Sequence, residues 1–161
     1  MIALKRTISK EIEVVVRTLS ETDSAQVQVL DLLSNNNVSA SLDIDWYAWG
    51  LFQNNKLLAY CTIGGIDGTE HESIAKEMGA NPACTLSDVY VHPYCRRMGF
   101  GSELIKVAIE YMASNSTIFC TIFNASLYEF YESIGFEELE DGILCYKCKS
   151  NGNGGRETND R

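Results

Sequence analysis

The fold of this chain is decided by the stretch Val89-Tyr90-Val91-His92-Pro93-Tyr94-Cys95-Arg96-Arg97-Met98-Gly99-Phe100-Gly101-Ser102-Glu103-Leu104. It starts as a β-branched strand, turns on Gly99 and Gly101, and continues into an amphipathic helix expected from about Ser102 to Met112. The two glycines let backbone N–H groups approach a ligand with no Cβ in the way. The helix points its unpaired N–H groups and the positive end of its dipole at the same place. Strand, turn and helix start together predict an anion-binding site.

Two other phosphate-binding turns do not fit this stretch. A Walker A loop needs Gly-Lys-Ser/Thr, and Gly99-Phe100-Gly101-Ser102 has no lysine. A dinucleotide fingerprint needs a third glycine just beyond Gly101, where Glu103 and Leu104 stand, and a regular βα alternation. An alternative is that the glycines only turn the chain and hold no ligand. Arg96 and Arg97 beside the turn, in an otherwise acidic chain, favour the anion site.

The rest of the chain predicts a mixed sheet with helices. Upstream we expect a strand at Glu11–Arg17, a helix from Thr22-Asp23-Ser24 to Asn35-Asn36-Asn37, a hairpin of Trp46–Gln53 and Lys56–Gly64 around Asn54-Asn55, and a helix at Glu70–Met78 closed by Gly79. Downstream we expect strands at Thr85–His92 and Thr117–Phe123, a helix opened by a Ser126/Glu129 capping box and closed by Gly135, and a hairpin of Phe136–Glu140 and Ile143–Lys149 around Asp141-Gly142.

This order predicts one α/β (α+β mixed) domain, with a central, mostly antiparallel sheet of about seven strands and helices on both faces. The domain is expected over residues 1–149, and the glycine- and asparagine-rich residues 150–161 are expected to be a flexible tail. Strict alternation in the strand before the turn would place Leu86, Asp88 and Tyr90 on one face. Val89 and Val91 would then lie on the other face.

Composition narrows the function. The chain has 161 residues, 45% of them hydrophobic, which suits a single compact domain. Its net charge of −9 argues against nucleic acid as the main partner. An acidic surface can serve solubility alone, or it can attract a cationic amine as substrate. No run approaches the roughly 20 apolar residues of a membrane span, and the first residues lack a secretory signal pattern. We therefore expect a cytoplasmic protein with no membrane partner.

Six cysteines are present, and without a secretory signal they are expected to be free thiols. Cys145 and Cys148 have a CxxC spacing, but residues three apart in a strand point to opposite faces. No metal site is expected, because no second pair of ligands accompanies them. Neither Cys95 nor Cys120 has a partner acid or histidine suggested by spacing, so a cysteine nucleophile is not expected.

Two motifs carry a family resemblance. The turn resembles the Gln/Arg-x-x-Gly-x-Gly/Ala signature of the GNAT superfamily, the acetyl-CoA-dependent N-acetyltransferases. Further on, Asn124, Tyr131 and the pair Gly135-Phe136 stand at the spacing of that family's second signature. The matched core runs from about Leu86 to Phe136. Two motifs in the right order are far more specific than either alone.

The resemblance implies a set of cofactor contacts. The backbone of the strand before the turn would pair with the pantetheine amides, and the turn would hold the pyrophosphate of acetyl-CoA. The implied cofactor-binding residues are Val89, Tyr90, Val91, Arg96, Arg97, Met98, Gly99, Phe100, Gly101, Ser102 and Asn124. Tyr131 would stand at the thioester sulfur and protonate the leaving thiolate, with Tyr128 as the reserve candidate.

The two signatures do not specify the general base or the acceptor. Several such enzymes use a glutamate on the family's fourth or fifth strand, and this chain has none there. Asp88, acting through water, is the first candidate base, and His92 is the second. The acceptor is expected to be an amine of a small molecule or peptide. An alternative is a silent acyl-CoA-binding sensor.

Two further features could serve the acceptor or a partner. Four aromatic residues could wall an acceptor pocket, with two acids attracting its charge; they could equally be core residues. These residues are Trp46, Tyr47, Trp49 and Phe52, with Asp43 and Asp45. An exposed strand at Ile143–Lys149 could pair across a homodimer.

Overall fold

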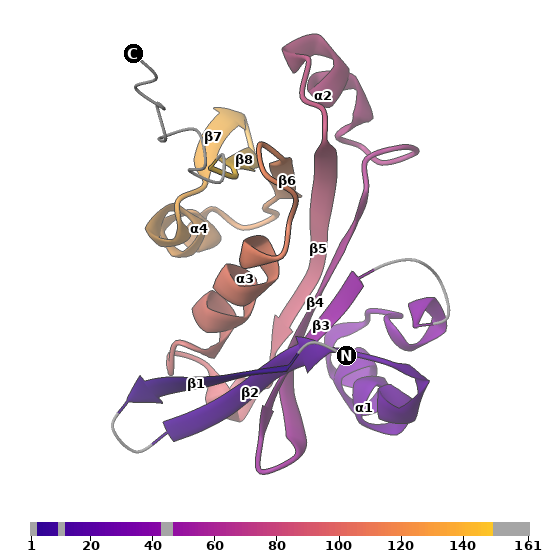
Figure 1. Ribbon diagram of the computed structural model, residues 1–161, viewed down its shortest axis with the longest axis vertical. Helices are drawn as coiled ribbons and strands as arrows, with labels where there is room; N and C mark the ends of the chain where they lie inside the picture. Colours follow the sequence, from indigo (N-terminus) through magenta and orange to yellow (C-terminus); the bar gives the residue numbers. More distant parts are fainter. Residues whose placement is uncertain (1–2, 10–11, 43–46, 150–161) are drawn as a thin grey trace, which may run out of the picture.

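A computed structural model describes residues 3–9, 12–42 and 47–149, and these form one eight-stranded sheet with helices on both faces (Figure 1). The strands are β1 (Ala3–Ser9), β2 (Ile12–Thr18), β3 (Tyr47–Gln53), β4 (Lys56–Gly65), β5 (Ala83–Val91), β6 (Thr117–Thr121), β7 (Glu137–Glu140) and β8 (Ile143–Lys147). The α-helices are α1 (Ser24–Ser34), α2 (Glu72–Met78), α3 (Phe100–Glu110) and α4 (Tyr128–Ile134).

The sheet confirms the predicted class. Its order is β1-β2-β3-β4-β5-β6-β8-β7, and every neighbouring pair is antiparallel except β5 with β6. The predicted tail at 150–161, and Asp43, Asp45 and Trp46, lie outside the described residues.

The eighth strand is β1, which the sequence did not predict. It is an edge strand whose run of Lys5, Arg6 and Thr7 has no clear apolar alternation. Its position is supported by packing: Leu4 contacts the main core, and Arg6 reaches two acids of α3. Edge strands carry charges of this kind commonly, which weakens their signal in the sequence.

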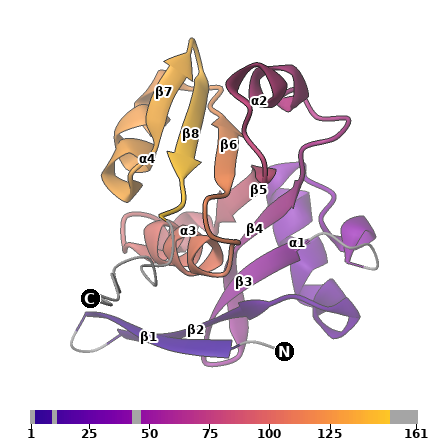
Figure 2. The ribbon, with the colours of Figure 1, turned by 45° about the horizontal axis from the view of Figure 1, so that its top comes forward.

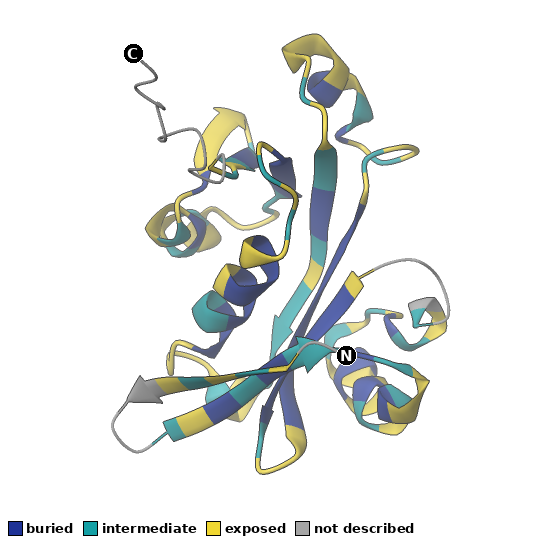
Figure 3. Cartoon of the chain, in the orientation of Figure 1, coloured by how far each residue is buried: buried dark blue, intermediate teal, exposed yellow. Residues whose placement is uncertain are grey.

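Two clusters of buried apolar side chains flank the sheet. Figure 2 shows helices on both sides of the sheet, and Figure 3 colours the buried stretches of the strands and helices dark blue. The larger cluster lies between the sheet and α3 and α4, and includes Trp49, Leu104 and Tyr131. A second cluster lies between the sheet and α1, around Val27 and Tyr60. We call the two sides the α3 face and the α1 face. The helix α2 packs on the α1 face through a small cluster with Phe119.

Trp49 and Phe52, considered above as walls of an acceptor pocket, belong to these cores. Trp49 is 1% exposed and stacks on Tyr111, and Phe52 is 4% exposed. Each therefore packs in the core, although Phe52 also borders a hollow beside Arg17 and the Asn54-Asn55 turn. Of the described aromatics in that proposal, only Tyr47 faces solvent.

The predicted hairpins are confirmed. Asn54 and Asn55 both have positive φ, 49° and 63°, as a tight two-residue turn requires. Gly142 also has positive φ, 78°, in the second hairpin. The second hairpin corrects the dimer proposal, because β8 is hydrogen-bonded to both β6 and β7. The strand at Ile143–Lys147 is thus interior, and the edge of the sheet is β7.

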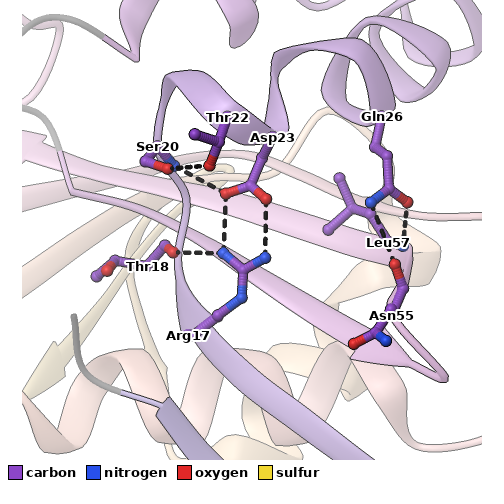
Figure 4. Close-up of polar contacts among 8 residues, drawn as sticks. All are labelled: Arg17, Thr18, Ser20, Thr22, Asp23, Gln26, Asn55 and Leu57. Carbon is purple, nitrogen blue, oxygen red and sulfur yellow. Dashed lines mark hydrogen bonds and ion pairs between the residues drawn. The ribbon is translucent and has the colours of Figure 1, made fainter.

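The start of α1 is tied to the sheet by polar contacts (Figure 4). The Arg17 guanidinium donates two hydrogen bonds of 2.8 Å to the Asp23 carboxylate, which is buried. Gln26 donates to the Asn55 carbonyl and accepts from the Leu57 N–H at 2.8 Å. These contacts hold α1 on β2 and on the β3–β4 hairpin.

We expect Asp23→Asn to lower the free energy of unfolding by about 3 kcal/mol at neutral pH, because it leaves a largely buried guanidinium unpaired. The hydrogen bonds from Arg17 hold the pKa of Asp23 below its usual range. Its stabilising effect is therefore present at neutral pH and is lost as the pH falls through that lowered value, below about pH 4. Urea unfolding of both proteins from pH 7 to pH 3 measures this. A difference that stays constant with pH would contradict the assignment.

Candidate active site

An opening lies between β5 and β6. The two strands pair only at Ala83 with Thr117, Cys84 with Ile118 and Thr85 with Phe119. The strand β5 then continues to Val91, and over these described residues its partner is β4 alone. Figure 1 shows β5 running well beyond the short β6. The edge of β5 past Thr85 therefore presents N–H and C=O groups to which an extended ligand can pair.

A β-bulge shapes one side of this opening. Asp88 has φ 52°, and the register shifts so that Asp88 and Val89 both lie opposite Cys61 of β4. The extra residue reverses the alternation, so the predicted faces are wrong. Leu86, Val89 and Val91 pack on the α3 face, whereas Tyr90 packs on the α1 face.

The turn after β5 has the predicted form. Arg97 and Gly99 have φ values of 63° and 82°, and Arg96 donates from Nε to the Val91 carbonyl at 3.2 Å. The helix α3 begins at Phe100 instead of Ser102, and its first internal bond runs from the Glu103 N–H to the Gly99 carbonyl at 3.0 Å.

The N–H groups of the first turn of α3 precede that bond, so they are oriented along the helix axis toward the turn. They belong to Phe100, Gly101 and Ser102. The side chain of Phe100 is 1% exposed and anchors the helix start in the core, while Arg97 and Met98 are exposed. The turn can therefore offer backbone donors, a helix dipole and arginine charge to one anion.

Gly101 is needed for close packing at this point. A Cβ there would lie 3.2 Å from Val91 and 3.3 Å from Phe130 of α4. The side chains of Val91 and Phe130 thus leave little room for a side chain at position 101, between β5, α3 and α4.

Tyr131 lies on the α3 face at the opening. Its side chain is 6% exposed and packs edge-on against Phe130 and Phe136. Its hydroxyl contacts the Cys120 thiol, and Cys120 directly follows the last β6 residue that pairs with β5. Burial, then the neighbouring thiols, raise the pKa of Tyr131. The phenol is therefore protonated at neutral pH, which is the state a proton donor requires, while burial makes it a weaker acid than a free tyrosine.

Asn124 caps the chain after β6. Its Oδ1 accepts a hydrogen bond of 3.0 Å from the Ser126 N–H, and Ala125–Leu127 form a 3₁₀ turn before α4 begins at Tyr128. The predicted Ser126/Glu129 capping box is wrong, because the capping side chain is Asn124, two residues before Ser126. Asn124 and Tyr128 also line a hollow of about 400 Å³ that Glu138 and Asp141 close on the far side.

The two candidate bases lie in different places. Asp88 is exposed, and its Oδ2 accepts a hydrogen bond of 2.9 Å from Thr62 of β4. His92 instead caps the next turn, since its Nδ1 accepts from the Tyr94 N–H at 3.2 Å and its ring stacks on Tyr94. Of the two, only Asp88 lies at the bulge beside the opening.

A histidine that the sequence did not single out bridges β5 and β6. His71 is 1% exposed, with Nδ1 3.2 Å from Thr85 Oγ1 and Nε2 2.7 Å from Thr121 Oγ1. The carboxylate of Glu70 lies 3.7 Å from Nε2, and burial lowers the pKa of His71. Glu70 and His71 both lie in the segment between β4 and β5, where the sequence predicted only the start of a helix.

Within the described residues no group of three or more His, Cys, Asp or Glu side chains is placed to hold a metal ion, and no helix there is both long and apolar enough to cross a membrane. Cys145 packs on the α1 face and Cys148 on the α3 face. Burial raises the pKa of Cys120 to about 11, which disfavours a thiolate nucleophile.

Comparison with known proteins agrees with this geometry. The sequence pattern described as the acetyltransferase (GNAT) family matches residues 21–136. The chain therefore belongs to the GNAT acetyltransferase family. No curated protein sequence matches it.

Solved structures share the fold. The ribosomal-protein-S18-alanine N-acetyltransferase from Escherichia coli is 18% identical, with a TM-score of 0.63 over 87% of this chain and 97% of that one. A GNAT acetyltransferase from Listeria monocytogenes 4b F2365 is 15% identical, with a TM-score of 0.66 over 89% and 98%. The PaiA N-acetyltransferase from Thermoplasma acidophilum, solved with coenzyme A, is 14% identical, with a TM-score of 0.58 over 86% and 99%. At these identities the likeness is one of fold.

Proposed function

We propose that this protein transfers an acetyl group from acetyl-CoA to a primary amine of a small molecule or peptide, by direct attack in a ternary complex. One observation supports the proposal: β5 continues past its last pair with β6, so its free edge runs from the end of that pairing to the turn before α3. Family membership supports acetyl transfer, and the fold neighbours named above include N-acetyltransferases and a coenzyme A complex.

The donor would occupy the α3 face. The turn from Arg96 to Ser102 would bind the pyrophosphate, with its N–H donors from the first turn of α3. The pantetheine arm would run past Gly101 and pair with the backbone of Val89, Tyr90 and Val91. Asn124, whose Oδ1 is already used, would contribute its amide nitrogen.

The reaction would then take place at the opening. The amine nitrogen attacks the thioester carbonyl, and a backbone N–H of β5 can stabilise the oxyanion that forms. The C–S bond breaks, and Tyr131 gives its hydroxyl proton to the leaving thiolate. Holding both reactants at one gap removes much of the entropic barrier.

The acceptor would arrive from the α1 face, because α3, α4 and the donor fill the other side. Asp88 lies at the bulge and is exposed, so its carboxylate can attract a cationic amine and accept its proton through water. The net charge of −9 favours the same class of acceptor.

The test is to incubate the protein and acetyl-CoA with pooled amines and identify acetylated products by mass spectrometry, with thiol release as the rate measurement. Acetylated amine with matching thiol release is the expected result. Tight acetyl-CoA binding by calorimetry with no thiol release for any amine would instead favour a silent acyl-CoA sensor. Absence of thermal stabilisation by millimolar acetyl-CoA would contradict both.

A further inference from the structure

We propose that Thr121 and His71 form a proton relay that takes the proton from the acceptor amine, an inference that rests on the proposed acetyl transfer. The relay lies on the α1 face of the opening, on β6 and the segment before α2, and the bulge at Asp88 lies on the neighbouring strand β5. It would take the proton directly, in place of the water-mediated transfer to Asp88 considered above, and Asp88 would then serve to attract the cationic amine.

The position of the relay follows from strand pairing. Thr121 lies two residues beyond Phe119, the last β6 residue that pairs with β5, so its hydroxyl stands at the opening. It is half-buried, unlike the buried His71 behind it. Neighbouring residues of a strand point to opposite faces. Thr121 therefore faces the α1 side, while the adjacent Cys120 contacts Tyr131 on the α3 side.

The hydrogen bonds around His71 favour one tautomer of its ring. The Thr69 hydroxyl donates to the Ile66 carbonyl, and the Thr85 hydroxyl donates to Thr69 Oγ1 at 3.4 Å. Thr85 then offers lone pairs to His71, which favours a ring that donates from Nδ1–H. In the neutral ring Nε2 then carries the lone pair, and it faces the Thr121 hydroxyl at 2.7 Å.

This arrangement allows a balanced proton transfer. As the nitrogen–carbon bond forms, the amine proton passes to Thr121 Oγ1, and the Thr121 hydroxyl proton passes to His71 Nε2. The electron pair of the breaking C–S bond leaves on sulfur, which takes the proton of Tyr131. The imidazolium proton afterwards returns through Thr121 to solvent or to the tyrosinate, which resets both groups.

The surroundings of His71 suit a base that is charged only briefly. The ring is neutral at neutral pH because burial lowers its pKa. Among the described residues, the charged group facing it is Glu70, with Oε1 3.7 Å from Nε2. From β5 and β6 it meets Thr85, Thr121 and the stacked ring of Phe119. Glu70 can therefore stabilise the imidazolium when it forms.

The first test is Thr121→Val, which removes the hydroxyl and keeps the side-chain shape. We expect kcat/KM to fall by roughly thirtyfold or more, while the melting temperature stays within a few degrees. Thr121→Ser keeps the hydroxyl and should retain most of the rate. The pH profile separates the relay from a structural role: with the same amine, the wild-type protein should lose activity at acidic pH more steeply than Thr121→Val, because only the wild type depends on neutral His71.

The second test does not depend on an acceptor. The chain has two histidines, so ¹⁵N spectra of the imidazole rings can be assigned with His92→Gln. We expect His71 to hold its proton on Nδ1 at neutral pH, and the Nε2–H tautomer would overturn the relay. Wild-type activity with an unaffected Thr121→Val would also overturn it. No thiol release from the wild type with any amine would overturn the proposed acetyl transfer itself.

Discussion

The Tyr131→Phe variant should release the thiol of coenzyme A at least roughly tenfold more slowly than the wild type, while it still binds acetyl-CoA. The change removes one oxygen from a side chain that is otherwise held by Phe130 and Phe136. The thiolate then leaves without a proton donor, so kcat falls. Steady-state thiol release gives kcat, and calorimetry with acetyl-CoA gives the affinity.

A matched control is Tyr111→Phe. Tyr111 caps the end of α3, stacks on Trp49 and is 39% exposed. Loss of its hydroxyl should leave turnover unchanged. If Tyr131→Phe behaved like this control, Tyr131 would be a core residue only, and Tyr128 would become the candidate donor.

The Gly101→Asp variant should bind acetyl-CoA at least about a hundredfold more weakly, a loss of about 3 kcal/mol. The new side chain enters the narrow space against Val91 and Phe130 and brings a negative charge to the helix start. The pyrophosphate would then meet both a steric block and repulsion. Thermal shift and calorimetry over a series of acetyl-CoA concentrations measure the change.

Gly65→Asp is the control for this variant. A Cβ at Gly65 meets no atom within 4 Å, so the same charge is added at an open site. Its affinity should match the wild type. Equal affinity of Gly101→Asp and wild type would show that the turn holds no phosphate, and the glycines would serve the turn alone.

The elements with local signals were predictable from the sequence. The asparagine pair at Asn54-Asn55 predicted a tight turn because that residue type tolerates positive φ, which both residues adopt. The turn at Gly99 and the amphipathic stripe of α3 likewise depend on nearby residues only. Family resemblance then added roles for Tyr131 and the turn that no local pattern contains.

Features that depend on strand pairing were not predictable. Strict alternation placed Leu86 and Tyr90 on one face, and the bulge at Asp88 separates them. The bulge arises from pairing with β4, and the alternation rule carries no information on where an extra residue will be accommodated. His71 was missed for the same reason, because Thr85 and Thr121 meet its ring only after β5 and β6 pair.

The early parting of β5 from β6 has a consequence for substrate size. Because the gap passes through the sheet, the carrier of the acyl group and the nucleophile need not share one cavity. A bulky nucleophile, such as the chain end of another folded protein, could present its nitrogen from outside without displacing the carrier. Selection among nucleophiles should then depend on the loops around α1 and α2, on the opposite side of the sheet from the turn before α3.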